Sequence, residues 1–280
     1  GFALGGLLGV SLGWRPVFFL AAVPGFILAA VVWFLPEPAR GQADYESLGL
    51  ERQESVPAAV PLGTALRHLF SVPTLIITYA VGVLLSLSTV GLIFWMPTLA
   101  VRAYGYGEGQ AGLIVGVLTV VAGAAGVLSG GWVADRLLLR TPAARLLTIG
   151  ASLLAGFAFA WLATIAPNRV LFLTLAALAV YAFTFYFPCL APLIHQVTRP
   201  ELRATAMALG LLLIHVLGNA PAPALVGWIS DRSGDLRLGL TATLFVAVLA
   251  GALALWGSRF VARDTRNMLE QLSSPGTDAV

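Results

Sequence analysis

Long apolar runs with almost no charge inside them restrict the fold of this sequence more than any other feature. They cover approximately residues 1–12, 16–35, 72–101, 109–134, 143–165, 169–194, 204–230 and 237–261. A helix needs about 20 apolar residues to cross the hydrocarbon core of a bilayer. Only 10% of the residues are charged, whereas soluble domains carry about 25%. The sequence therefore predicts an all-α polytopic membrane protein, in which the first run is too short for a full span.

Composition divides the chain into four parts. Residues 1–35 hold the first two apolar runs, and residues 71–262 hold six spans joined by short loops. Residues 36–70 are rich in charges and prolines and are predicted to be a linker, with a short amphipathic helix near residues 62–70. Residues 263–280 are polar and are expected to form a fraying tail.

The arginines are distributed unevenly between the two sides of the predicted membrane, and the chain has no lysine. Loops on the side of the linker contain Arg40, Arg52, Arg67, Arg136, Arg140, Arg145, Arg199, Arg203, Arg259, Arg263 and Arg266. The opposite loops contain only Arg15, Arg102, Arg169, Arg232 and Arg237. Because positively charged loops stay on the cytoplasmic side, we expect the linker and the C-terminus to be cytoplasmic.

Motifs for enzyme chemistry are not found in the sequence. GEGQAG (107–112) matches a dinucleotide-binding pattern, but it follows an apolar helix rather than a strand, so no nucleotide site is predicted. His68, His195 and His215 are far apart, and no P-loop or zinc motif is present. The single cysteine, Cys189, is expected to pack in an apolar interior. A net charge of +3 is too small to suggest nucleic-acid binding. We therefore predict neither an enzyme nor a cofactor.

The span at residues 204–230 is interrupted by polar residues and prolines. His215 and Asn219 are four positions apart and share one helix face. Pro221 and Pro223 remove backbone donors and clash with the preceding turn. Such breaks occur where the backbone is buried in protein or lines a cavity, and broken helices often mark transporter binding sites. His215 and Asn219 are therefore predicted to line a substrate cavity. The alternative is an interhelical polar clamp beside a structural kink.

Two further spans carry hydroxyl groups at helical spacing, the first span after the linker and the fourth. These residues are Thr78, Ser86 and Thr89 in the first span and Tyr181 and Thr184 in the fourth. Both sets are predicted to line the same substrate cavity. Serine and threonine hydroxyls can instead bond to their own helix, so a purely structural role stays open.

The second span after the linker contains closely spaced small residues and ends in a short motif that is repeated later in the chain. GLIVG (112–116) and GVLSG (126–130) place glycines four residues apart, a spacing that lets helices approach closely in lipid. GWVADR (131–136) ends this span, and GWISDR (227–232) ends the fifth. Three spans separate the two motifs, so an inverted repeat, common in secondary transporters, would place them at opposite ends of the bundle.

Two apolar blocks joined by a polar linker, with six spans in the second block, resemble the major facilitator superfamily. GGWVADRLLLR (130–140) resembles its signature loop between the second and third spans of a half. Leu138 and Leu139 depart from the usual glycine and basic residue of that loop. GGLLGVSLGWRPVFFLAAVPG (5–25) resembles the fifth and sixth spans of the first half.

FWMPTLAVRAYG (94–105) together with residues 199–231 is similar to the Spinster branch, whose members move lysolipids and sphingolipids, often with proton coupling. Asn219 departs from the acidic residue that usually follows the glycine in this motif. The resemblance implies that residues 1–35 correspond to the last two helices of the N-terminal half and residues 71–262 to the C-terminal half. It also implies that the first four spans, with the main proton-coupling residues, lie outside this chain.

The resemblance gives the signature loop a role in alternating access. Gly131, Asp135, Arg136 and Arg140 match its pattern. Such charges can pair with a neighbouring span in one conformation and release it in the other. We predict that these residues form a conformational latch. The alternative is an interfacial charge cluster that follows the positive-inside rule.

These patterns and the resemblance together predict a secondary transporter of the bacterial inner (plasma) membrane. It would move a small amphiphilic substrate by alternating access, with membrane lipid and protons as further partners. Proton coupling within this chain depends on His215, the only ionisable side chain deep in a predicted span. The alternatives are a drug or metabolite exporter of the same superfamily and a non-transporting, truncated membrane module that needs a partner.

Overall fold

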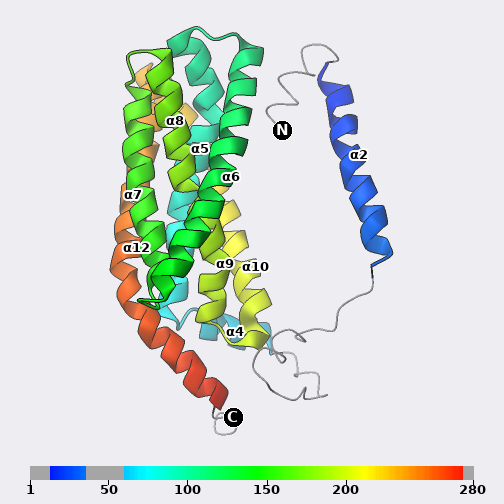
Figure 1. Cartoon of the computed structure of the whole chain (residues 1–280), viewed down its shortest axis with the longest axis vertical. Coiled ribbons are helices and arrows are strands. Elements are labelled where there is room, and N and C mark those ends of the chain that lie inside the picture. The colour runs from blue at the N-terminus through cyan, green and yellow to red at the C-terminus, as the bar shows by residue number, and fades with distance from the viewer. Residues whose placement is uncertain (1–12, 36–59, 274–280) are drawn as a thin grey trace.

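The computed structural model describes residues 13–35 and 60–273, and the regular structure within these ranges is helical (Figure 1). Seven helical stretches in this part of the chain are long and apolar enough to cross a membrane. The elements are α2 (Trp14–Trp33), α4 (Leu62–Leu69), α5 (Pro73–Tyr104), α6 (Glu108–Leu138), α7 (Ala144–Thr164), α8 (Arg169–Phe183), α9 (Tyr186–Gln196), the 3-10 helix η1 (Pro200–Leu202), α10 (Arg203–Leu213), the π-helix η2 (Ile214–Asn219), α11 (Ala222–Ser233) and α12 (Leu236–Ser273).

The observed helices confirm the all-α fold and the positions of the predicted spans. The span expected at residues 72–101 is α5, and the short amphipathic helix expected near residues 62–70 is α4. Helices α5 and α6 run a few residues beyond their apolar runs, to Tyr104 and Leu138, within the usual uncertainty of helix ends. The first apolar run, residues 1–12, lies outside the described residues.

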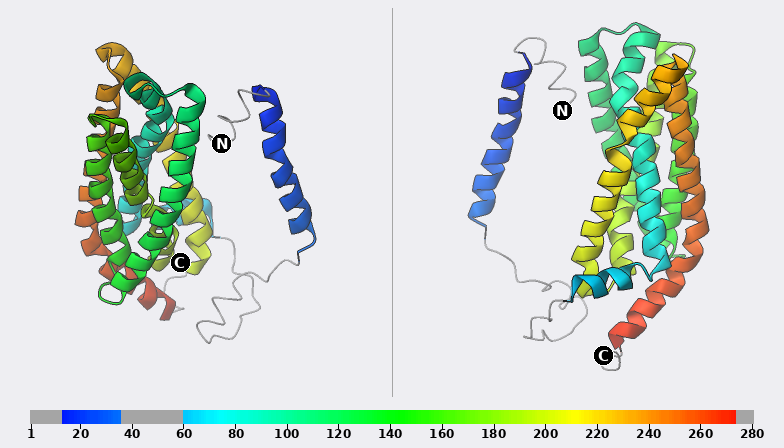
Figure 2. Two further views of the ribbon diagram at one scale, coloured as in Figure 1. Left: turned by 45° about the horizontal axis from the view of Figure 1, so that its top comes forward. Right: turned by 180° about the vertical axis from the view of Figure 1, so that it is seen from behind.

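Helix α2 stands apart from the other helices in all three views (Figures 1 and 2). Its most apolar window has a mean hydropathy of 2.2 and is 0% buried. Phe19, Phe26 and Trp33 are each at least 76% exposed. A helix with this surface requires lipid or further protein around it.

Helices α5, α7 and α12 form the most closely packed side of the bundle. Ile149 and Leu153 on α7 and Leu244 on α12 are fully buried. Gly150 and Gly251 let the two backbones meet, because a Cβ on either glycine would lie 3.1 Å from the other's carbonyl oxygen. The hydrophobic effect does not drive helix association in lipid. Small residues at such contacts let the helices approach closely enough for van der Waals packing to hold them together.

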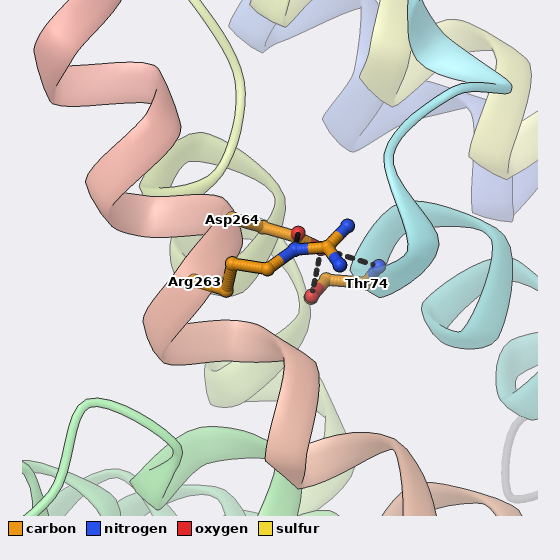
Figure 3. Close-up of polar contacts among 3 residues, drawn as sticks. All are labelled: Thr74, Arg263 and Asp264. Atoms are coloured by element: carbon orange, nitrogen blue, oxygen red, sulfur yellow. Dashed lines mark hydrogen bonds and ion pairs between the residues drawn. The ribbon is translucent and has the colours of Figure 1, made fainter.

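The last helix shows that the prediction of a fraying tail is wrong for residues 263–273. Helix α12 continues without interruption to Ser273. The Asp264 side chain lies against the start of α5, where it accepts hydrogen bonds from the backbone N and Oγ1 of Thr74 at 2.9 and 2.7 Å (Figure 3). This contact joins residues 190 positions apart, so local polarity could not reveal it. Residues 274–280 lie outside the described residues.

Candidate functional site

The fourth span after the linker is interrupted between α8 and α9, and a proline explains the interruption. Helix α8 ends at Phe183 and α9 begins at Tyr186. Pro188 has no backbone N–H for the carbonyl of Thr184, and its ring crowds that carbonyl. The Thr184 carbonyl oxygen instead accepts from the Phe187 N–H at 3.2 Å, so the chain bends without leaving this acceptor unpaired.

The fifth span is interrupted by the π-helix η2, which confirms the break predicted from Pro221 and Pro223. A bond from Ala220 N to His215 O, 2.9 Å long, spans five residues and closes the wider turn. The two prolines cannot donate to the carbonyls four residues earlier, which lie within η2. Short π-helical segments are rare and occur frequently at functional sites.

The two interruptions meet α5 at Gly82. A Cβ on Gly82 would lie 2.7 Å from the Tyr186 hydroxyl of α9 and 2.7 Å from Cδ1 of Ile214, the first residue of η2. One turn further along α5, Ser86 packs so closely that a Cβ on Gly218 would lie 2.7 Å from Ser86 Cβ. Glycines permit this approach of helices in lipid. We call the meeting point of α5, α9 and η2 the three-helix junction.

His215 and Asn219 lie on η2 beside the three-helix junction. The His215 side chain is exposed, and its Nδ1 lies 2.7 Å from the carbonyl oxygen of Leu211. Because a carbonyl only accepts, Nδ1 carries the proton in the neutral ring, and Nε2 presents a lone pair. Asn219 is half-buried, and its Oδ1 is buried with no hydrogen-bond partner in the described part of the chain.

Tyr186 places a second unsatisfied polar atom at the three-helix junction. Its side chain is 5% exposed, and its hydroxyl has no hydrogen-bond partner among residues 13–35 and 60–273. A buried polar group without a partner is costly in the hydrocarbon and requires an explanation. A ligand, a water molecule or a second conformation can supply the partner. Sequence reasoning did not single out Tyr186, and the only signal for it was the aromatic density of residues 181–187.

The three predicted hydroxyls of α5 occupy different environments. Thr78 is 1% exposed, Thr89 is half-buried, and each donates to the carbonyl four residues earlier on its own helix, at 2.7 and 3.0 Å. These bonds match the structural role that the sequence left open. Ser86 is 9% exposed and packs against Gly218, so among the three it is Ser86 that lies at the three-helix junction.

Tyr181 and Thr184 contact α6. A Cβ on Gly126 would collide with Thr184 Oγ1 and with the carbonyl oxygen of Tyr181. A Cβ on Gly130 would lie 2.8 Å from the backbone of the α8–α9 connection. The close helix approach predicted from GVLSG is thereby confirmed. Ser129, which sequence reasoning missed, donates from Oγ to the Tyr181 hydroxyl at 2.9 Å.

The four predicted latch residues lie at the C-terminal end of α6 and in the turn that follows it. A Cβ on Gly131 would be 3.5 Å from Pro188, an ordinary contact. Asp135, Arg136 and Arg140 are exposed. The three charged groups are therefore accessible to another helix that approaches this end of the bundle.

Helices α6 and α11 finish at opposite ends of the bundle (Figure 2), and each finishes with a tryptophan–arginine pair of the same local geometry. The Arg136 guanidinium lies 4.7 Å from the centre of the Trp132 ring at the end of α6. The Arg232 guanidinium lies 4.4 Å from the centre of the Trp228 ring at the end of α11. This arrangement agrees with the inverted placement predicted for the two motifs.

Apolar spans in which two interrupted helices meet a third are the architecture of secondary transporters. Residues 1–223 match the family model of the Major Facilitator Superfamily. Because the match covers most of the 280 residues, the chain belongs to this superfamily of membrane transporters. It is thus an integral membrane protein of a transporter family and not an enzyme.

Curated relatives confirm the resemblance to the Spinster branch. Probable sphingolipid transporter spinster homolog 1 of Arabidopsis thaliana is 28% identical over 283 residues, covering 92% of this chain and 56% of that protein. An MFS-type efflux pump of Mycolicibacterium smegmatis is 29% identical over 277 residues, covering 95% of this chain and 61% of the pump. The chain spans a little over half the length of these relatives.

The fold itself is similar to a solved bacterial homolog of the human lysosomal transporter Spinster, in its inward-facing and unoccupied conformation. The TM-score is 0.70, with 21% sequence identity. The similarity covers 92% of this chain and 63% of the solved one. The helical arrangement described above is therefore that of a known transporter fold.

Proposed function

We propose that the protein is a secondary transporter that moves an amphiphilic, lipid-like small molecule across the membrane by alternating access. The three-helix junction carries this proposal. Two interrupted spans meet α5 at Gly82, with the unsatisfied atoms of Tyr186 and Asn219 beside the exposed imidazole of His215. Interrupted helices supply polar groups at membrane depth, where a carrier must hold its substrate.

The polar groups at the junction suit a headgroup that both donates and accepts hydrogen bonds. Asn219 Oδ1 can accept from a hydroxyl or an ammonium group, and the Tyr186 hydroxyl can donate to a phosphate or hydroxyl oxygen. Beside them, η2 exposes Val216 and Leu217, at 57% and 52%, as an apolar surface for an acyl chain. A lysolipid or sphingoid compound is the first candidate, supported by the Arabidopsis relative's name.

A drug or metabolite exporter of the same superfamily is the second candidate. The Mycolicibacterium smegmatis relative is described as an efflux pump and matches 95% of this chain. A mostly apolar surface with few polar groups would also accept hydrophobic drugs. Comparing transport of a labelled lysolipid with transport of a hydrophobic dye separates the two candidates.

Proton coupling and orientation complete the proposal. His215 is an ionisable side chain within a span, and its Nε2 is available to take a proton. We place the linker and the C-terminal end of α12 on the cytoplasmic side of a bacterial inner membrane, because the arginines concentrate on that side. Dependence of uptake on an imposed pH gradient would test the coupling.

Replacement of His215 by alanine is expected to reduce transport about tenfold, because one hydrogen bond of about 1–2 kcal/mol to the substrate is lost. Uptake of labelled lysolipid and sphingoid base into proteoliposomes measures this, normalised to incorporated protein. Val170→Ala is the matched control, because Val170 is an exposed apolar residue at the start of α8, outside the three-helix junction. Normal uptake by His215→Ala would remove His215 from the site, and no uptake of any tested amphiphile by the unmodified protein would contradict the transporter proposal.

Asp135→Asn is expected to slow turnover about fivefold without changing substrate affinity, because the carrier loses about 1 kcal/mol of ion-pair stabilisation in one of its two states. Steady-state uptake gives turnover, and equilibrium binding of the substrate gives affinity. Glu108→Gln, at the other end of α6, is the control and should change neither. A large loss of binding with unchanged turnover would count against the latch.

A further inference from the structure

Helix α4 lies across one end of the bundle (Figures 1 and 2), and its buried residues form a single apolar face. Ala65 and Leu69 are 2% and 0% exposed, whereas Leu62 and Arg67 face outward. The two buried residues belong to a hydrophobic cluster separate from the bundle core. The other members of this cluster, here called the α4 seat, are Leu75, Tyr79, Ile194, Val197, Leu202 and Ala206.

The α4 seat is built from the parts of two spans that lie on the linker side of their interruptions. Ile194 belongs to α9, which follows the break after α8, and Ala206 belongs to α10, which precedes η2. Tyr79 of α5 joins them, because its hydroxyl donates to the carbonyl oxygen of Ala206 at 2.8 Å. Helix α4 therefore contacts the segments that move if α9 and α10 bend at their interruptions.

The start of α5, which directly follows α4, is held by the last helix (Figure 3). Asp264 Oδ2 accepts from the N and Oγ1 of Thr74, and Asp264 Oδ1 lies 3.5 Å from Arg263 Nε. Val72, at the N-cap position of α5, provides no side-chain bond, so Asp264 supplies the cap from a distant helix. This contact, the Asp264 clamp, makes α5 and α12 a fixed frame against which α4 docks.

A cavity of about 100 Å³ lies between α4 and the clamp, lined by His68, Arg263 and Asp264 among others. His68 is half-buried and faces this cavity. The charged groups around it are Arg263 and Asp264 of α12, Arg67 of its own helix, and Arg199, which pairs with Glu201 at 3.4 Å. Arg263 pairs with Asp264, and Arg199 pairs with Glu201, so the charges around His68 are two ion pairs and the neighbouring Arg67.

Partial burial and the Arg199 guanidinium lower the pKa of His68 from its ordinary value of 6.5. Docked α4 therefore binds a proton less tightly than free α4 does. It follows by linkage that docking is fully favourable while His68 is neutral in both states, above pH 6.5. Docking weakens as the pH falls through that value. Helix α4 has eight residues, and two of them are buried, so few contacts oppose its release.

We propose that α4 is a pH-sensitive lever, which stays in the α4 seat while His68 is neutral and leaves it when His68 becomes protonated. A protonated imidazole would place a positive charge in a half-buried position near Arg199. Release of α4 removes the apolar brace between α9 and α10 and frees both segments to bend at their interruptions. The linker thereby regulates movement of the bundle independently of the substrate.

Spin labels on Thr64→Cys in α4 and Ala262→Cys in α12 measure the docked population by their distance distribution, in protein reconstituted into nanodiscs. Both positions are exposed, and the native Cys189 is fully buried and stays unlabelled. At about pH 8 we expect one narrow distribution, and at about pH 5 a second, broader population, because these values bracket the titration of histidine.

Two substitutions of His68 make the test specific. His68→Gln, which is always neutral, is expected to stay docked at both pH values, and His68→Arg, which is always charged, is expected to be undocked at both. His215→Gln is the matched histidine control and should keep the pH response. An unmodified protein whose distribution ignores pH overturns the proposal. A response that persists in His68→Gln also overturns it, by assigning the titration to another group such as His195.

Discussion

Gly126→Ala is expected to lower the stability of the bundle by about 3 kcal/mol, the upper part of the range for overpacking. The added methyl group would collide with Thr184 Oγ1 and the Tyr181 carbonyl oxygen, and a backbone atom in a packed helix cannot move aside cheaply. Helix α6 must then separate from α8 and α9, which also breaks the bond between Ser129 and Tyr181. Thermal unfolding followed by size-exclusion fluorescence in detergent measures the loss.

Gly123→Ala is the matched control for this prediction. Gly123 lies one turn earlier on α6, where a Cβ would meet Thr184 Cγ2 at 3.6 Å, an ordinary van der Waals distance. Both substitutions gain the same helix propensity, about 1 kcal/mol, so the difference between them isolates the packing effect. Equal unfolding temperatures for the two variants would show that α6 does not pack against the α8–α9 connection as described.

Asp264→Ala is expected to destabilise the protein by about 2–4 kcal/mol, because the N–H and hydroxyl of Thr74 lose a charged acceptor. The side chain is 3% exposed, so water cannot replace the acceptor without movement of α12. Thermal unfolding measures the stability, and limited proteolysis near residue 264 reports whether the end of α12 detaches. We expect faster cleavage there in the alanine variant.

Asp264→Asn and Thr74→Val each remove only part of the contact between Asp264 and Thr74. Asparagine keeps one acceptor oxygen and caps helices well, so its effect should be about half that of alanine. Thr74→Val removes the hydroxyl donor and keeps the backbone donor, so it should cost about 1 kcal/mol. If Asp264→Ala unfolds at the same temperature as the unmodified protein, the clamp does not stabilise the start of α5.

The membrane spans could be predicted from the sequence because the bilayer imposes the same length and hydrogen-bonding requirements on every span. Each must present about 20 apolar residues and satisfy its own backbone hydrogen bonds. The predicted span at residues 204–230 therefore appears as η1, α10, η2 and α11 between Pro200 and Ser233. Its interruption was also predictable, because Pro221 and Pro223 disturb their own helix through covalent structure.

The environment of individual side chains was only partly predictable. Thr78, Ser86 and Thr89 share one face of α5 in sequence, yet Ser86 reaches the three-helix junction while Thr78 is buried and bonded to its own helix. The rotation of α5 against η2 and α12 decides this, and helical periodicity does not encode the identity of the neighbour. Tyr186 was missed for the same reason, because its meeting with Gly82 joins residues about one hundred positions apart.

Residues 263–273 show the limit of composition as a guide. Their charges predict a frayed end, but α12 continues because Asp264 finds two donors at the start of α5. A carboxylate is costly to bury alone and favourable beside the free N–H groups of a helix start. A contact with a distant part of the chain decides whether the carboxylate is buried alone or beside a helix start. Residues 263–273 by themselves are therefore compatible with a frayed end and with a continued helix.

The sequence by itself determined the helical class, the order of the spans within residues 13–35 and 60–273, and the break at η2, because each depends on one segment and its solvent. Tertiary structure decided that the two interruptions converge on Gly82 and that Thr184 packs on Gly126. It also decided that Asp264 caps α5. These contacts depend on the relative rotation and depth of separate helices. In lipid, close packing and a few polar bonds set the rotation and depth of each helix, and hydrophobic burial does not. An apolar sequence pattern therefore cannot specify how the helices are rotated against one another.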